Sequence, residues 1–269
     1  MKRAAHGAAV AGHEAIGAAI RAAAARGDPA LVAYLTAGFP NTAGFAADLG
    51  RVAATADVVE VGVPFTDPMA DGMTIQRASH AALGQGVSLA WILEQLRALE
   101  PPPAAPLLLM SYLNPLLAFG VERLPAAARA ARVAGFIVPD LPYEESAELR
   151  AALAAEGIAL VQMVTPVTPP ERLARLCADA HGFIYAVTMT GTTGKNVEVP
   201  ESVLEYLDRV RALARIPVCA GFGIRSRAQV ARLAGHVDGV VVGSALVEVL
   251  ERGADPVAFL AGLRAGSMS

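Results

Sequence analysis

The chain has few cysteines, few aromatic residues and no excess of positive charge. Its 269 residues include only two cysteines, Cys177 and Cys219, which lie far apart and form no Cys-x-x-Cys motif. We therefore expect neither a disulfide framework nor a thiolate metal site, and we predict a reduced, cytoplasmic protein. Aromatic residues make up 5% and the formal net charge is −3. Base stacking and phosphate neutralisation are thus poorly supported, and we expect no nucleic-acid partner.

Long apolar runs are also missing, because no stretch reaches the roughly 20 uninterrupted apolar residues of a membrane span. The first residues are basic and alanine-rich, but Gly12, His13 and Glu14 interrupt the apolar core that a signal peptide needs. The segment instead shows the spacing of an amphipathic leading helix at Val10, Ile16, Ala19, Ile20 and Ala23. The five histidines are scattered without metal-ligand spacing, so no metal site is predicted.

Short apolar runs bounded by turn residues recur along the chain and predict eight β-strands. They are Leu31–Thr36, Val58–Gly62, Pro106–Ser111, Gly135–Val138, Ala159–Val164, Phe183–Thr188, Pro217–Ala220 and Gly239–Val242. Helical patterns such as Glu145–Ala155 and Val203–Ala214 lie between them. Capping boxes that begin at Thr168 and Ser226 mark two helix starts.

Strands that alternate with helices indicate a parallel α/β fold, either a doubly wound sheet or a closed barrel. The strand count favours a single (β/α)8 TIM barrel over residues 1–269, with residues 1–28 as an additional N-terminal helix and connection. The glycine- and threonine-rich segment Thr190–Pro200 is predicted to be a mobile loop. In such a barrel the functional residues lie at the carboxyl ends of the strands.

Glu60 is unusual because it lies inside an otherwise apolar strand. Side chains alternate along a strand, so Glu60 shares a face with Val58, opposite to Val59 and Val61. An inward carboxylate among valines is desolvated, which raises its pKa and suits a general acid or base. The alternative is a structural ion pair, for which Arg225, just after the seventh strand, is the only candidate at a strand end.

The loop that follows contains two aspartates, Asp67 and Asp71. Asp71 precedes a helical segment and suits either a catalytic role or an ordinary helix N-cap. Asp67 precedes Pro68 and suits a turn equally well.

Glycine-rich turns follow the last three strands, at Gly191–Gly194, Gly221–Ile224 and Gly243–Ser244. Barrels often bind phosphate after strands seven and eight, where glycines and the N-terminus of a short extra helix approach the anion. Residues 244–247 suit that short helix, so we predict a phosphate site here.

Together these residues resemble the tryptophan synthase alpha chain family over nearly the whole sequence. The most specific match runs from Glu60 through Gly-Val-Pro-Phe-Thr-Asp-Pro to Ala70-Asp71-Gly72, supported by Met110–Pro115, Pro139–Pro142 and the glycine turns. The resemblance implies a lyase of tryptophan biosynthesis, which cleaves indole-3-glycerol phosphate to indole and glyceraldehyde 3-phosphate. Met73 departs from the proline that the family usually has.

The resemblance also implies the roles of individual residues. Glu60 would be the main acid and base, Asp71 would hydrogen-bond the indole N–H, and Tyr185 would complete the catalytic set. The substrate-binding residues would be Tyr34, Thr36, Ile75 and Tyr112 around the indole, with Gly194, Gly223, Gly243 and Ser244 around the phosphate. The loop after the sixth strand would close over the substrate.

By resemblance, the partner is the tryptophan synthase beta chain in an α2β2 heterotetramer. That subunit would carry the pyridoxal phosphate, and this chain would carry no cofactor. The contacts would come from the loops Thr66–Gly72, Asn114–Leu117 and Asp140–Tyr143.

Three alternatives remain open at this point. A sugar-phosphate isomerase of histidine synthesis is disfavoured because the sequence shows no duplicated half-barrel with an aspartate in each half. A non-catalytic activator of a beta chain is disfavoured because both carboxylates are present. A stand-alone indole-releasing lyase would need the same residues, and the sequence does not separate it from a subunit.

Overall fold

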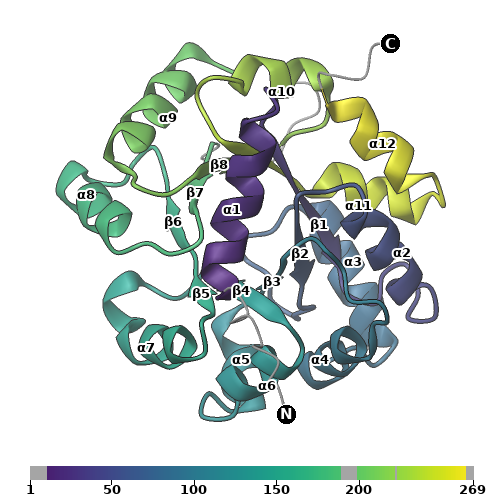
Figure 1. Ribbon diagram of the computed structural model, residues 1–269. Helices are drawn as coiled ribbons and strands as arrows, with labels where there is room; N and C mark the ends of the chain where they lie inside the picture. The colour runs from purple at the N-terminus through teal and green to yellow at the C-terminus, as the bar shows by residue number, and fades with distance from the viewer. Residues whose placement is uncertain (1–10, 189–198, 222, 265–269) are drawn as a thin grey trace, which may run out of the picture.

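The computed structural model describes residues 11–188, 199–221 and 223–264. These residues form a ring of nine parallel strands surrounded by helices (Figure 1). The strands are β1 (Ala30–Thr36), β2 (Val58–Gly62), β3 (Leu107–Met110), β4 (Val133–Ile137), β5 (Ala159–Leu160), β6 (Gln162–Val164), β7 (Ile184–Val187), β8 (Val218–Gly221) and β9 (Gly239–Val242). They pair in the order β5-β4-β3-β2-β1-β9-β8-β7-β6.

The predicted TIM barrel is confirmed, with one difference at the fifth predicted strand. The run Ala159–Val164 is divided at Val161 into β5 and β6. β5 pairs with β4, whereas β6 pairs with β7, so the chain changes neighbours within this short segment. The two pieces together occupy the position of one barrel strand and complete the ring.

The helices alternate with the strands and cover the outside of the ring. They are α2 (Phe45–Ala53), α3 (Met73–Gly84), α4 (Leu89–Ala98), α5 (Leu113–Phe119), α6 (Leu124–Ala130), α7 (Ala147–Ala155), α8 (Pro170–Ala178), α9 (Glu201–Leu213), α10 (Arg227–Leu233), α11 (Ser244–Glu251) and α12 (Pro256–Leu263), with a 3-10 turn at Tyr143–Glu145.

Two apolar layers follow from the alternation of side chains along each strand. In β1, Leu31, Ala33 and Leu35 belong to the outer core between strands and helices. Val32 belongs to the inner core of the barrel. The barrel interior is therefore a packed, mostly apolar core.

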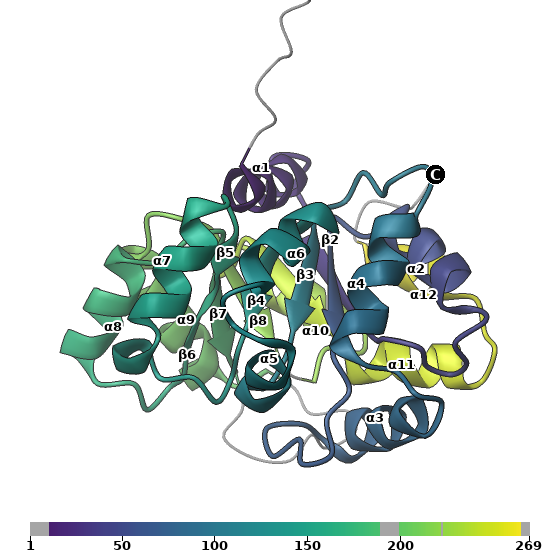
Figure 2. The same cartoon turned by 90° about the horizontal axis from the view of Figure 1, so that it is seen from below.

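The leading helix α1 (Gly12–Ala24) closes the amino end of the barrel (Figure 1). Its buried residues Ile16, Ile20 and Ala23 pack against the inner core, as the spacing predicts. Figure 2 shows α1 at one end of the barrel and α3 at the opposite end. The site must therefore be sought at the α3 end.

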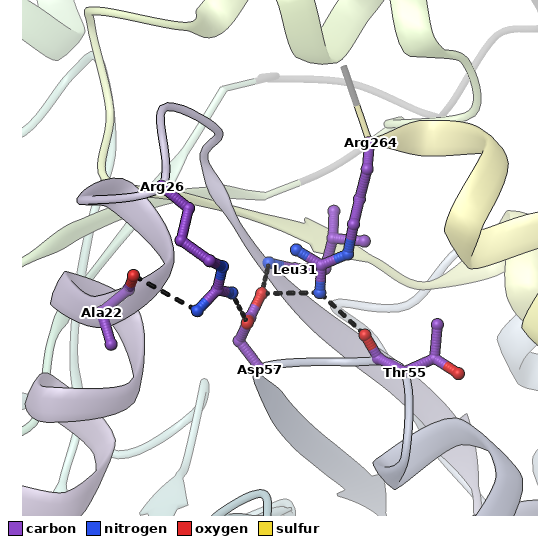
Figure 3. A network of polar contacts seen from close by, with 6 residues as sticks. All are labelled: Ala22, Arg26, Leu31, Thr55, Asp57 and Arg264. Atoms are coloured by element: carbon purple, nitrogen blue, oxygen red, sulfur yellow. Dashed lines mark hydrogen bonds and ion pairs between the residues drawn. The ribbon is translucent and has the colours of Figure 1, made fainter. Parts of the chain in front are cut away.

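A polar network around Asp57 fastens α1 and the C-terminal helix to the barrel (Figure 3). The Asp57 side chain, only 10% exposed, accepts hydrogen bonds from the Leu31 amide at 2.8 Å and from Arg26 at 2.7 Å. Arg264, which follows α12, donates to Asp57 at 3.0 Å and to the Thr55 carbonyl at 2.7 Å. One carboxylate thus joins four segments at the closed end.

One of the two predicted capping boxes is wrong. Ser226 caps α10 reciprocally with Gln229, as predicted. Thr168 does not cap α8, because the helix begins at Pro170 with Pro169 in the capping position. The Thr168 hydroxyl instead accepts the Thr165 amide at 2.9 Å and closes the preceding turn.

Candidate active site

Glu60 lies in the middle of β2 and points into the barrel, as the alternation predicts. Its neighbours Val59 and Val61 belong to the outer core, and Val58 belongs to the inner one. Glu60 is aligned with Tyr34 of β1. The residue is 1% exposed, and within the part of the chain that the structure describes its Oε2 atom has no hydrogen-bond partner.

Burial controls the protonation of Glu60. Desolvation, with a smaller contribution from the nearby charge of Asp71, raises the pKa of Glu60 from 4.5 to about 8. The side chain is therefore mostly a neutral acid at pH 7, with a proton that it can donate.

The structural alternative for Glu60, an ion pair with Arg225, is wrong. Arg225 pairs with Glu248 of α11, to which it donates two hydrogen bonds of 2.8 and 2.9 Å. A buried carboxyl without an ion-pair partner costs free energy, which makes Glu60 a candidate functional group.

Asp71 lies in the loop between β2 and α3, and it does not cap the helix. Gly72 occupies the N-cap position of α3, without a side-chain cap. The Asp71 Oδ2 atom instead accepts the Tyr112 hydroxyl at 3.1 Å. Burial raises the pKa of Asp71 to about 6, although the hydrogen bond from Tyr112 lowers it. Asp71 is therefore mostly ionised at pH 7.

Asp67 has a different environment in the same loop. It is exposed, and the Thr66 hydroxyl donates to it at 2.5 Å. Its carbonyl accepts the Met69 amide at 2.9 Å, which is the turn that its position before Pro68 predicts.

A single pocket at the carboxyl end of the barrel contains both carboxylates, Glu60 and Asp71. Six further residues predicted for the site also line it: Tyr34, Ile75, Tyr185, Gly223, Gly243 and Ser244. Ile224 and Ala245 also line it, and they lie in the turn and the short helix predicted for the phosphate. The sequence interpretation did not assign the other lining residues to the site: Gly72, Met110, Arg225 and Val241. Met110 and Val241 could have been found, since each lies one residue before the end of a predicted strand.

Two predicted substrate-binding residues do not line this pocket. Thr36 is buried, and its hydroxyl lies 3.3 Å from the hydroxyl of Tyr34. Tyr112 is 4% exposed and lies between the Asp71 carboxylate and the Ala70 amide, which donates to its hydroxyl at 2.9 Å. Gly194 lies outside the described residues, as does the predicted mobile loop up to residue 198.

Two glycines make room for the pocket tyrosines. A Cβ atom on Gly62 would lie 2.1 Å from the Tyr34 hydroxyl, and one on Gly221 would lie 2.3 Å from the Tyr185 hydroxyl. Real Cβ atoms do not approach so closely, so each tyrosine needs a glycine on the adjacent strand. Burial raises the pKa of both phenols, which therefore keep their protons.

The other end of the pocket is formed by backbone. Gly223 has a positive φ of 83°, a conformation that favours glycine. The α11 helix begins at Ser244, as predicted, and the Gly243 carbonyl accepts the amides of Leu246 and Val247. The first amides of a helix have no acceptor within it, so those of Ser244 and Ala245 are available to an anion in the pocket.

No helix among the described residues is long and apolar enough to cross a membrane. Those residues also contain no cluster of side chains that could hold a metal ion. The chemistry that this geometry supports is proton transfer by carboxylates next to an anion site.

Known proteins agree with this geometry. The family model described as "Tryptophan synthase alpha chain" matches residues 20–261. The tryptophan synthase alpha chain of Nitratidesulfovibrio vulgaris (strain DP4) is 46% identical over 242 residues, which are 90% of this chain and 94% of the relative. That of Carboxydothermus hydrogenoformans is 43% identical over 228 residues, with 84% and 85% covered.

Solved structures show the same likeness. Tryptophan synthase from Mycobacterium tuberculosis in space group F222 has a TM-score of 0.84 and 36% identity, with 93% of this chain and 98% of that chain covered. The tryptophan synthase a2b2 complex from Pyrococcus furiosus gives a TM-score of 0.81 and 36% identity, with 88% and 98% covered. The chain therefore belongs to the tryptophan synthase alpha chain family.

Proposed function

We propose that this protein is a carbon–carbon lyase of tryptophan biosynthesis, which cleaves indole-3-glycerol phosphate to indole and glyceraldehyde 3-phosphate. The observation that carries the proposal is the placement of Glu60, a buried carboxyl with an unpartnered oxygen, in one pocket with the N-terminus of α11. Apolar lining residues suit the flat indole ring, and the backbone amides at Gly243–Ala245 suit the phosphate.

The two carboxylates have different roles because their environments separate their protonation states. Glu60, mostly protonated at pH 7, donates its proton to carbon 3 of the indole ring. The ring nitrogen then carries positive charge, and the ionised Asp71 stabilises it by accepting the indole N–H hydrogen bond.

The carbon–carbon bond breaks in the second step. The Glu60 carboxylate accepts the proton of the glycerol hydroxyl next to the ring, and that carbon becomes the aldehyde of glyceraldehyde 3-phosphate. The electrons of the broken bond return to the ring and leave neutral indole. Glu60 ends protonated, as it began, so one buried carboxyl serves as acid and then as base.

Direct measurement of indole release from indole-3-glycerol phosphate tests this assignment. Glu60→Gln and Asp71→Asn are each expected to lower kcat by about 10²-fold or more, since both groups act on the reacting ring. Asp67→Asn is the matched control, because it changes an exposed carboxylate of the same loop and should retain activity. Undiminished indole release by Glu60→Gln contradicts the mechanism, whereas absence of indole release by the wild-type chain favours the non-catalytic alternative.

We further propose a tryptophan synthase beta chain as partner, in an α2β2 assembly. Large apolar side chains lie exposed near the mouth of the pocket: Met69 is 86% exposed, Met73 75% and Leu117 53%. They lie in or beside two of the segments predicted to contact the partner, of which Asn114–Leu117 was predicted as a loop but belongs to helix α5. Such exposure is typical of an interaction surface. Membership of the family leads us to expect pyridoxal phosphate in that partner, while proton transfer by Glu60 and charge stabilisation by Asp71 account for the reaction of this chain.

Co-purification with the beta chain separates a subunit from a stand-alone lyase. Leu117→Glu, on α5, should weaken the complex while the isolated chain still releases indole. Val257→Glu is the control, because Val257 is 36% exposed on α12, outside the predicted contact loops. If wild type and Leu117→Glu bind the beta chain equally well, this surface is not the interface.

We place the enzyme in the cytoplasm. The thiols of Cys177 and Cys219 are both buried and unpaired, which suits a reducing compartment.

A further inference from the structure

Arg225 lies at the phosphate end of the pocket. It follows β8 and lines the same pocket as Gly223, Gly243 and Ser244. Among the described residues that line the pocket, Arg225 is the only one with a basic side chain. The glycine turns that predicted this anion site gave no indication of a cation beside it.

The guanidinium of Arg225 is fixed by α11, the helix whose first amides face the pocket. Its two terminal nitrogens donate to the two carboxylate oxygens of Glu248, one helical turn after Ser244. Thr74 of α3 donates to the same carboxylate at 3.2 Å. The ion pair is 21% exposed at Arg225 and 22% at Glu248, so solvent screens it only in part.

The neighbouring helices hold this arrangement in place. Figure 2 shows α3 and α11 side by side, and Arg77 of α3 donates two hydrogen bonds to Glu251 of α11 at 2.7 and 2.9 Å. The Arg225 guanidinium therefore has a fixed position relative to the first turn of α11. Of its five N–H groups, two bind Glu248, which leaves others for a ligand.

The cation matters because the pocket and its ligand both carry negative charge. At pH 7 Asp71 is mostly ionised whereas Glu60 is mostly neutral, and a phosphate ester adds up to about two negative charges near neutral pH. Backbone amides supply only partial positive charge. A guanidinium at the pocket wall offsets the repulsion, and the Glu248 carboxylate weakens that effect because it neutralises part of the charge.

We propose that Arg225 is a further substrate-binding residue, which favours ligands that carry a phosphate, and that Glu248 limits its strength. The proposal deepens the proposed function and rests on it, because the anion in question is the substrate phosphate. It predicts that loss of the Arg225 side chain weakens phosphate binding and that loss of the Glu248 charge strengthens it. If the ion pair were purely structural, both substitutions would change phosphate binding in the same direction.

Calorimetric titration with two probes tests the proposal. sn-Glycerol 3-phosphate reports on the phosphate end, and indole reports on the rest of the pocket. Arg225→Gln should raise the Kd of glycerol phosphate about tenfold, which corresponds to about 1.4 kcal/mol. Glu248→Gln should lower that Kd about threefold, and both variants should change the Kd of indole less than twofold. Arg225→Lys keeps the charge without the paired donors and should fall between wild type and Arg225→Gln.

Four results would overturn the proposal. Weaker glycerol phosphate binding in Arg225→Gln and Glu248→Gln alike would make the pair structural, as would an equal loss of indole binding. Unchanged phosphate binding in Arg225→Gln and Arg225→Lys would remove Arg225 from the site. If the wild type binds neither probe, the proposed function fails first and the inference fails with it. Thermal melts of each variant show whether it is folded. If Arg225→Gln does not fold, the comparison of Arg225→Lys and Glu248→Gln with wild type still tests the proposal.

Discussion

Replacement of Glu60 by glutamine should remove activity and yet make the protein more stable at alkaline pH. In the folded protein the pKa of this carboxyl rises from 4.5 to about 8. A carboxyl that holds its proton more tightly in the folded than in the unfolded state lowers the free energy of unfolding as pH rises through that interval. The destabilisation begins near pH 4.5 and is complete once the pH exceeds about 8.

The size of the effect follows from the same two values. Each pKa unit corresponds to 1.36 kcal/mol, so complete ionisation of buried Glu60 costs about 5 kcal/mol. Between about pH 6 and about pH 9 the linkage relation gives about 2.5 kcal/mol of that cost. For a protein of this size the change corresponds to roughly 5–10 °C in Tm.

The assay is thermal or urea unfolding of wild type and Glu60→Gln, without ligand, across this pH range. The quantity of interest is the difference between the two proteins at each pH, in which the titration of all other groups largely cancels. Glu205→Gln, an exposed glutamate on α9, makes the same chemical change and should show no such trend. A stability difference for Glu60→Gln that stays constant with pH would refute the burial argument and, with it, the neutral acid that the mechanism requires.

Three further outcomes are expected. The pH profile of kcat/KM should be bell-shaped, with loss below about 6 as Asp71 is protonated and loss above about 8 as the buried glutamate ionises. Tyr112→Phe removes a hydrogen bond that favours ionised Asp71, so the acid limb should move upward by about one pH unit and kcat should fall; an unmoved limb would exclude this coupling. Gly221→Ala places a methyl group against the Tyr185 hydroxyl and should lower kcat/KM at least about tenfold, whereas Gly50→Ala, whose added carbon meets nothing within 4 Å, should be neutral.

Regular elements were predictable because their signals are local. The predicted bounds of β2 and β9 match the structure residue for residue. Burial of Glu60 could also be predicted, because alternation along one strand decides which face a side chain takes. The break at Val161 could not, since it depends on which neighbouring strands the two halves pair with.

Contacts between loops could not be predicted from the sequence. The Tyr112 hydroxyl donates to Asp71, 41 residues earlier in the chain, a contact that the sequence interpretation did not include. Arg225 was considered as a partner for Glu60, and Glu248 holds it instead. The first contact depends on how the loops before α3 and α5 meet, and the second on how α11 packs against the turn after β8, which no local pattern specifies.

Helix α1 closes the amino end of the barrel and so affects where substrate and products can pass. Within the described residues, Ile16, Ile20 and Ala23 fill the amino end of the barrel, and the pocket lies at the opposite end. The substrate would then enter, and glyceraldehyde 3-phosphate and indole would leave, at the same end of the barrel. A beta chain bound at this end would lie at the exit of both products, so its binding would affect the release of glyceraldehyde 3-phosphate and of indole.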